Sequence, residues 1–237
     1  MMMNCDLRFS VGFDMNALSL GVRIPLYIDF SSVPHLLIVA PSGAGKTHLL
    51  TIILKQFAQK PVILLLADFK GIDFTKMEGC THYYRHRAVA DALSLAFDTL
   101  QKRMSNPDED RTPLILCFDE WSGFLSLYGK KDQENFKQMM ASILMLGRGV
   151  GVFVIMALQR ADASYITGRD NFGNAIGLGR LSAESTRMLF PDDTPQIEPQ
   201  PRGQGCLRTD GKPLQKIVVP QIRSTEKAKS VIINMLR

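Results

Sequence analysis

The feature that most constrains the fold of this chain is the stretch Ala-Pro-Ser-Gly-Ala-Gly-Lys-Thr at residues 40–47. It follows an apolar run at residues 36–40 and precedes a helical pattern at residues 47–59. This is the setting that the phosphate-binding loop GxxxxGK[ST] requires. Gly43 and Gly45 allow backbone amides to turn toward phosphate oxygens, and the N-terminus of the following helix faces the same anion. The stretch therefore predicts a nucleotide site between a buried strand and a helix.

Two side chains of this loop would carry the chemistry. We expect Lys46 to reach the β- and γ-phosphates of ATP and Thr47 to ligate Mg²⁺. Ala40 replaces the first glycine of the pattern, which leaves the other two glycines in place. A chance glycine-rich turn is the alternative, and the flanking strand and helix argue against it. The residues expected to bind ATP are Pro41, Ser42, Gly43, Ala44, Gly45, Lys46, Thr47 and His48.

Strand and helix patterns alternate along most of the chain. Strands are predicted at residues 36–40, 62–67, 114–118, 150–158 and 175–179, and helices at residues 47–59, 87–104, 133–146 and 183–190. Strands that are apolar on both faces are typical of a parallel sheet with helices packed on both of its faces. We therefore predict an α/β fold with a parallel-core sheet, right-handed crossovers and helices on both faces.

The remaining segments are expected to complete a single domain over residues 1–237. Residues 22–30 predict a strand in a short N-terminal β segment that spans residues 1–33. Residues 191–213 are rich in proline and glycine and predict a surface loop. The tail from Ser224 predicts one capped helix within residues 221–237, which leaves residues 34–220 as the nucleotide-binding core.

Two acids end one of the buried strand patterns. Asp119 and Glu120 would lie at the carboxyl edge of the sheet, where ligands of open α/β sheets bind. We expect Asp119 to hold Mg²⁺, directly or through water, and Glu120 to orient and deprotonate the attacking water. A hydrolase needs this second acid, which a small-molecule kinase usually lacks. The alternative is an ordinary acidic cap that follows a strand.

Composition indicates where the protein is located but does not identify its partner. Lys and Arg number 28 against 23 for Asp and Glu, an excess that is compatible with a polyanionic partner but does not require one. The four cysteines are scattered, which argues against a disulfide framework or a zinc site. No window has the pattern of a secretory signal or a membrane span. We therefore expect a cytoplasmic protein that does not insert into a membrane.

Several segments together resemble one family, the FtsK/SpoIIIE translocases of the FtsK/HerA superfamily. The similar segments are PHLL at residues 34–37, DFKG at 68–71, QKRM at 101–104, FDEW at 118–121, GRGVGV at 147–152, ALQR at 157–160, ITG at 166–168 and RLS at 180–182. They occur in the family's order across about residues 18–236. The resemblance implies a P-loop NTPase fold of the RecA/ASCE-like kind and an ATP-hydrolysing motor.

The sequence also departs from this family. Leu158 replaces a threonine and Trp121 a phenylalanine, and we expect Trp121 to pack in the core. His35 is expected to be structural, because no histidine or cysteine at metal-ligand spacing accompanies it. The family's membrane anchor and its winged-helix module that reads DNA have no counterpart here. We interpret the chain as a reduced motor from a mobile element or phage.

The resemblance also implies roles for residues outside the two motifs. Gln159 would face the γ-phosphate, because the family places its strand between the strand of the phosphate loop and the strand of the acids. Arg180 would stabilise the transferred phosphoryl group of a neighbouring subunit. A structural ion pair is the alternative for Arg180, and the competing arginines are Arg148, Arg160 and Arg187. Asp68 and Lys70 would link the nucleotide to the neighbouring subunit or to DNA, or form an ordinary turn.

Three functions from different classes follow from these observations. The leading hypothesis is a homohexameric ring that hydrolyses ATP to move double-stranded DNA, with a membrane or DNA-reading partner protein. An ATPase that acts on protein substrates, as in type VII secretion, is supported by DFKG at residues 68–71. A nucleotide-switched adaptor is the third hypothesis. Glu120 argues against it, because a switch without turnover need not keep a catalytic acid.

Overall fold

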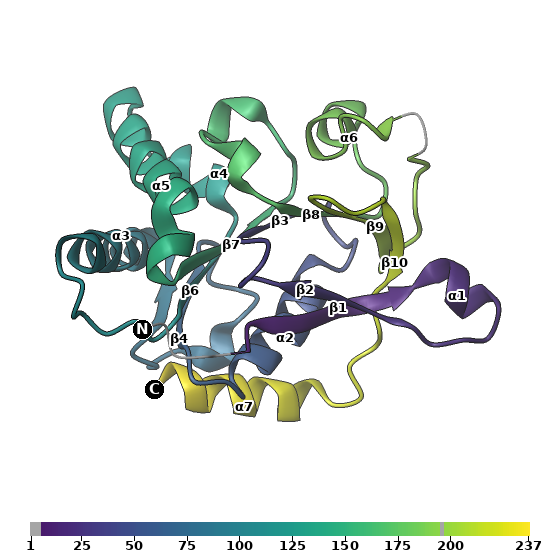
Figure 1. Ribbon diagram of the computed structural model, residues 1–237, viewed down its shortest axis with the longest axis horizontal. Helices are drawn as coiled ribbons and strands as arrows, with labels where there is room; N and C mark the ends of the chain where they lie inside the picture. The colour runs from purple at the N-terminus through teal and green to yellow at the C-terminus, as the bar shows by residue number, and fades with distance from the viewer. Residues whose placement is uncertain (1–5, 195–196) are drawn as a thin grey trace.

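The computed structural model describes residues 6–194 and 197–237, which form one mixed sheet with helices packed against it (Figure 1). The sheet has the strand order β2-β1-β10-β9-β8-β3-β7-β6-β4-β5. Its strands are β1 (Arg8–Asp14), β2 (Pro25–Asp29), β3 (Leu36–Val39), β4 (Ile63–Asp68), β5 (Tyr83–Arg85), β6 (Leu114–Asp119), β7 (Val152–Leu158), β8 (Asn174–Leu178), β9 (Gln204–Thr209) and β10 (Gln215–Val218). The strands from β8 to β5 in this order are parallel, and the others pair antiparallel.

Helices cover both faces of the sheet. In Figure 1, α3 and α5 lie on one side of the strands, and α2 and α7 lie on the other. The α-helices are α1 (Met15–Ser19), α2 (Lys46–Phe57), α3 (Val89–Ser105), α4 (Trp121–Leu125), α5 (Lys130–Val150), α6 (Ala183–Leu189) and α7 (Thr225–Leu236). Short 3₁₀ turns are η1 (Thr75–Met77), η2 (His86–Ala88), η3 (Ala163–Tyr165) and η4 (Arg169–Asn171). The predicted α/β class, with a parallel core between helical layers, is confirmed.

Apolar side chains fill both spaces between sheet and helices. Alternate residues of the parallel strands point into one core beneath α2 and α7 and into another beneath α3 and α5. Strands β3, β6 and β7 are buried along their whole length. This double burial explains why their sequences are continuous apolar runs, as parallel strands require. It also fixes the carboxyl ends of the three strands at one edge.

The strand order confirms one expectation that came from the resemblance. Strand β7 lies between β3 and β6, so the residue after β7 stands between the phosphate loop and the two acids. The N-terminal β segment is also present, as an antiparallel β1–β2 pair attached to β10. Its second strand begins at Pro25, and the short helix α1 precedes it.

Two sequence predictions were wrong. Helix α5 does not end at residue 146 but continues through the glycines to Val150, and β7 begins at Val152. Gly151 ends the helix with a φ of 73°, a conformation that glycine adopts without strain. Residues 191–213 are not only loop, because they contain β9, which pairs with β8 and β10. Strand β5 has three residues and no strand was predicted for it.

Two side chains outside the nucleotide loop have the structural roles expected of them. His35 is buried, and its Nδ1 accepts the Val154 N–H at 3.0 Å. Trp121 is buried against Phe118, and its indole N–H donates to the Tyr165 carbonyl at 2.7 Å.

Candidate active site

The loop between β3 and α2 has the backbone shape of a phosphate site. Gly43 and Gly45 have φ values of 78° and 110°, in the left-handed region that favours glycine. Gly45 directly precedes α2, so the N-terminus of this helix opens at the loop. The Gly203 N–H, in the turn before β9, donates to the Ala44 carbonyl at 2.9 Å and supports the loop. The amides and the helix dipole together can hold an anion.

Lys46 and the two acids form one buried cluster. The Lys46 ammonium forms an ion pair with Oδ1 of Asp119 and lies 2.6 Å from Oε1 of Glu120. All three residues are buried, Asp119 completely. Burial outweighs the attraction of Lys46 and raises the pKa of Asp119 to about 6. Burial also disfavours the Lys46 ammonium, yet the two carboxylates raise the pKa of Lys46 and keep it charged.

One oxygen of Asp119 fits a metal ligand. Its Oδ2 is buried and has no hydrogen-bond partner in the described part of the chain. Thr47 follows Lys46 in the first turn of α2, so it can add a hydroxyl oxygen. Residues 6–194 and 197–237 contain no group of three or more His, Cys, Asp or Glu side chains that could hold a metal ion by themselves. The Asp119 Oδ2 and the Thr47 hydroxyl are oxygen donors of the kind that bind Mg²⁺ together with phosphate oxygens and water.

Glu120 is held in an unusual backbone conformation. It has a φ of 64°, uncommon for a residue with a side chain, and it caps α4. Its Oε1 lies 3.4 Å from the Lys70 ammonium as well as 2.6 Å from Lys46. The sequence placed Lys70 after β4 and suggested a contact to another subunit or DNA. The structure places it beside the second acid, and a link to another subunit or to DNA stays a prediction.

A cavity of about 360 Å³ opens over the phosphate loop. Its wall includes most of the residues expected to bind ATP, together with Gln159 from the end of β7. His48 is part of this wall, and its ring N–H donates to the Pro220 carbonyl at 2.8 Å. The sequence did not identify Arg202, Ile72 and Asp73, which also line the cavity. Their proximity depends on the packing of β9 and of the segment after β4, for which no local motif exists.

The structure does not bring Arg180 into this cavity. Its side chain is exposed just after β8, on the carboxyl edge of the sheet. The preceding Gly179 packs so tightly against the phosphate loop that a Cβ there would lie 2.8 Å from the Ala44 Cβ. Arg180 is therefore close to the loop but free to face another molecule. Its role in trans stays a prediction.

The competing arginines have contacts of their own. Arg148 donates to the Ser31 carbonyl at 3.4 Å, and Arg160 pairs with Glu184 at 3.4 Å. Arg187 lines a separate hollow beside Arg169. None of these three side chains lines the nucleotide cavity.

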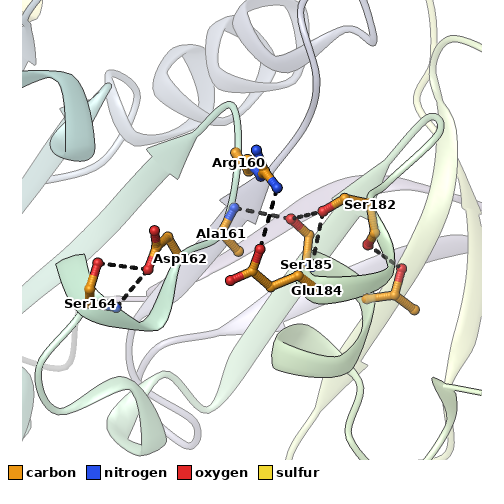
Figure 2. Close-up of polar contacts among 8 residues, drawn as sticks. Arg160, Ala161, Asp162, Ser164, Ser182, Glu184 and Ser185 are labelled. Carbon is orange, nitrogen blue, oxygen red and sulfur yellow. Dashed lines mark hydrogen bonds and ion pairs between the residues drawn. The ribbon is translucent and has the colours of Figure 1, made fainter.

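The loop after Gln159 is joined to the first turn of α6 (Figure 2). The Ala161 N–H donates to the buried Ser185 Oγ at 3.1 Å. Ser182 caps α6 by accepting the Ser185 N–H at 3.2 Å, and its hydroxyl donates to Ser185 Oγ at 3.0 Å. Figure 2 also shows the adjacent Arg160–Glu184 pair. The loop after Gln159, a residue of the cavity wall, is thus connected to the segment that follows Arg180.

The phosphate loop after β3, the acid pair at the end of β6 and the strand β7 between them define the class of this chain: it is a P-loop ATPase domain. The chain belongs to the FtsK/SpoIIIE family, whose model matches residues 14–178. The described residues contain no helix long and apolar enough to cross a membrane.

The relatives of this chain include an FtsK domain-containing protein and a secretion system protein. The FtsK domain-containing protein YdcQ of Bacillus subtilis is 26% identical over 69% of this chain and 38% of its own length. The ESX secretion system protein EccC of Thermomonospora curvata is 28% identical over 88% of this chain and 18% of its own length. This chain therefore spans well under half the length of these relatives.

Solved structures share the fold at lower identity. The pCW3 conjugation coupling protein TcpA superposes with a TM-score of 0.76 and 18% identity, over 97% of this chain and 72% of TcpA. The cytoplasmic domain of EccC from Thermomonospora curvata superposes with a TM-score of 0.72 and 22% identity, over 98% of this chain and 31% of the EccC chain.

Proposed function

We propose that this domain hydrolyses ATP to move double-stranded DNA through a homohexameric ring. The observation that carries the hydrolysis in this proposal is the buried cluster in which Glu120 stands beside Lys46 and Asp119 at the carboxyl edge of the sheet. A second acid at this place suits activation of water rather than simple nucleotide binding. DNA is the substrate we favour because relatives in the family include proteins named DNA translocase FtsK, and the fold is shared with a conjugation coupling protein.

The residues of the site have distinct roles in this proposal. Phosphate is bound by the loop from Pro41 to His48, with Lys46 on the β- and γ-phosphates. Thr47 and Asp119 would hold Mg²⁺, which supplies charge neutralisation at the phosphates. Glu120 orients the attacking water and accepts its proton. Gln159 senses the γ-phosphate.

Ring assembly completes the site in this proposal. Arg180 of one subunit stabilises the charge that develops in the site of the next. A head-to-tail arrangement of this kind forms a ring when the rotation between subunits closes. A membrane-embedded or DNA-reading partner would bring the ring to its substrate in the cytoplasm, in agreement with the cytoplasmic domain of EccC that shares the fold. Conjugative transfer on a mobile element is one process that such a motor would serve, as the likeness to TcpA suggests.

A second candidate is a motor that acts on proteins. Its support is the similarity to EccC, which covers 88% of this chain, and the DFKG segment at residues 68–71. The same ATPase site would serve either substrate, so the site does not decide between them.

ATP hydrolysis with different polymers tests both candidates. The protein is assayed alone, with linear duplex DNA, with single-stranded DNA and with an unfolded polypeptide, and Glu120→Gln serves as the inactive control. Stimulation by duplex DNA that is absent in Glu120→Gln supports the translocase. Stimulation by polypeptide alone would favour the secretion-type motor. Hydrolysis that Glu120→Gln retains would contradict the assignment of the active site.

A further inference from the structure

Two ammonium groups share one carboxylate oxygen in the active site. Oε1 of Glu120 lies 2.6 Å from Nζ of Lys46 and 3.4 Å from Nζ of Lys70. The Glu120 side chain is only 6% exposed, whereas that of Lys70 is 34% exposed and reaches in from the cavity wall. Lys46 has a second task, because the lysine of a phosphate loop engages the nucleotide. If Lys46 moves from Glu120 to the phosphates of ATP, Lys70 still supplies a cation beside Glu120.

The segment that carries Lys70 is fixed by a buried aspartate. Asp68 is completely buried at the end of β4. Its Oδ1 accepts the Gly71 N–H at 3.0 Å, and its Oδ2 accepts the Phe74 N–H at 3.2 Å and the Tyr83 hydroxyl at 3.1 Å. The carboxylate at the end of β4 therefore holds the residues that follow Lys70 in the turn. Asp68 therefore orders the turn from within the core. Lys70 is the side chain of this turn that reaches the active site.

Close packing ties the same segment to the helix that Glu120 begins. The Phe69 ring lies against Gly123 of α4, where an added Cβ would be 3.0 Å from the ring. It also packs edge-on against Phe124, with ring centroids 6.3 Å apart. Gly71 has a φ of 65° and faces the His86 ring, with no room for a Cβ. Phe69 thus packs the backbone before Lys70 against the helix that Glu120 begins, and Gly71 after it packs against His86.

We propose that Lys70 is a positioning residue for Glu120, which keeps the carboxylate in place for water activation once Lys46 engages the phosphates. Glu120 needs such support because its backbone has a φ of 64°, a left-handed conformation that persists only where surrounding contacts hold it. The proposal rests on Glu120 being the catalytic acid. The competing role for Lys70 is direct binding of phosphate, since its side chain also lines the cavity.

Lys70→Met separates the two roles, because it removes the charge and keeps most of the side-chain volume. We expect kcat for ATP hydrolysis to fall about 10- to 100-fold, as misplacement of a catalytic group does, with KM changed less than about twofold. Affinity for a non-hydrolysable ATP analogue, measured by fluorescence titration, should stay within about twofold of the wild type. Lys70→Arg, which keeps a cation at this place, should recover most of kcat.

Lys76→Met is the matched control, because Lys76 lies on the same connection after β4 but pairs with Glu226 outside the cavity. It should leave kcat, KM and analogue affinity unchanged. A Lys70→Met protein that binds the analogue weakly but keeps its kcat would assign Lys70 to phosphate binding and overturn the proposal. Unchanged kcat and KM in Lys70→Met would also overturn it. If Glu120→Gln still hydrolyses ATP, the proposed function fails instead. If Glu120→Gln is inactive and Lys70→Met is normal, only the role of Lys70 fails.

Discussion

At the scale of single residues, His35 makes the stability of the protein depend on pH. Burial lowers the pKa of His35 from 6.5 to about 4, so the folded protein keeps the ring neutral where the unfolded chain protonates it. The stability that the neutral ring provides is complete above pH 6.5 and decreases as the pH falls toward 4. His35→Asn keeps an acceptor for the Val154 N–H and tolerates the φ of 61° at this position, but it does not titrate.

Urea unfolding of both proteins at pH 7 and pH 5 tests this effect. The wild type should lose about 2 kcal/mol of unfolding free energy relative to His35→Asn between the two pH values. Asp119, whose pKa is also shifted into this range, is present in both proteins and cancels from the comparison. An advantage of the wild type that is equal at both pH values would contradict a neutral buried His35.

Residues of the site differ in how far the sequence could identify them. Lys46, Asp119 and Glu120 belong to short motifs with a recognisable strand before them, and the structure brings them together. The contact between Lys70 and Glu120 joins the tips of two strands, and no local pattern encodes its distance. Arg202 reaches the cavity through the turn before β9, which the sequence did not place.

At the scale of secondary structure elements, Gly205 decides whether β9 can pair with β8. A Cβ at Gly205 would lie 1.9 Å from the Gly177 carbonyl oxygen, a backbone atom that cannot move without disturbing the pairing. We expect Gly205→Ala to destabilise the protein by about 2–4 kcal/mol. Gly149→Ala is the control, because nothing lies within 4 Å of a Cβ there and the residue is inside α5. It should stabilise the protein by about 0.5–1 kcal/mol in the same urea titration.

The same pair of strands shows why element boundaries were misjudged. Residues 204–209 looked like loop because glycines and prolines surround them, yet pairing with β8 and β10 makes them a strand. Pairing with distant segments overrides local preference. The glycines at the end of α5 looked like a helix stop, but Gly147 is required by a close approach instead. A Cβ there would lie 2.2 Å from the Val152 carbonyl oxygen.

Helix α6 is expected to position the loop that carries Gln159 (Figure 2). Ser185→Ala removes the acceptor of the buried Ala161 N–H, which should cost about 1–3 kcal/mol of stability and loosen the loop. We expect a lower kcat, and no further loss when Ser185→Ala is added to Gln159→Ala, because both changes act through one side chain. Ser164→Ala, which removes a hydroxyl that donates to the Asp162 carboxylate further along the loop, should leave kcat unchanged. Additive losses in the double variant would contradict the coupling.

At the scale of the whole molecule, the parallel core and the antiparallel extension differ in how well the sequence predicts them. The core strands are apolar on both faces and are joined by helices, so class and layering follow from the pattern. The extension pairs β1 with β10, segments from opposite ends of the chain. No periodicity in the sequence predicts that segments so far apart in the chain will pair. The sheet nevertheless places Arg180 and the phosphate loop at the same edge, on adjacent strands.

That placement makes the trans role of Arg180 testable by mixing two inactive proteins. Arg180→Ala keeps Glu120 but cannot serve its neighbour, and Glu120→Gln keeps Arg180 but cannot activate water. If the arginine acts across the interface, about a quarter of the interfaces in rings assembled from an equal mixture contain both intact side chains. Hydrolysis should then exceed the sum of the separate proteins and reach its maximum near equal proportions. If the arginine acts within its own subunit, no mixture of the two variants contains a complete site. Activity of the mixture that stays at the level of the separate variants would therefore show that Arg180 serves the site of its own subunit.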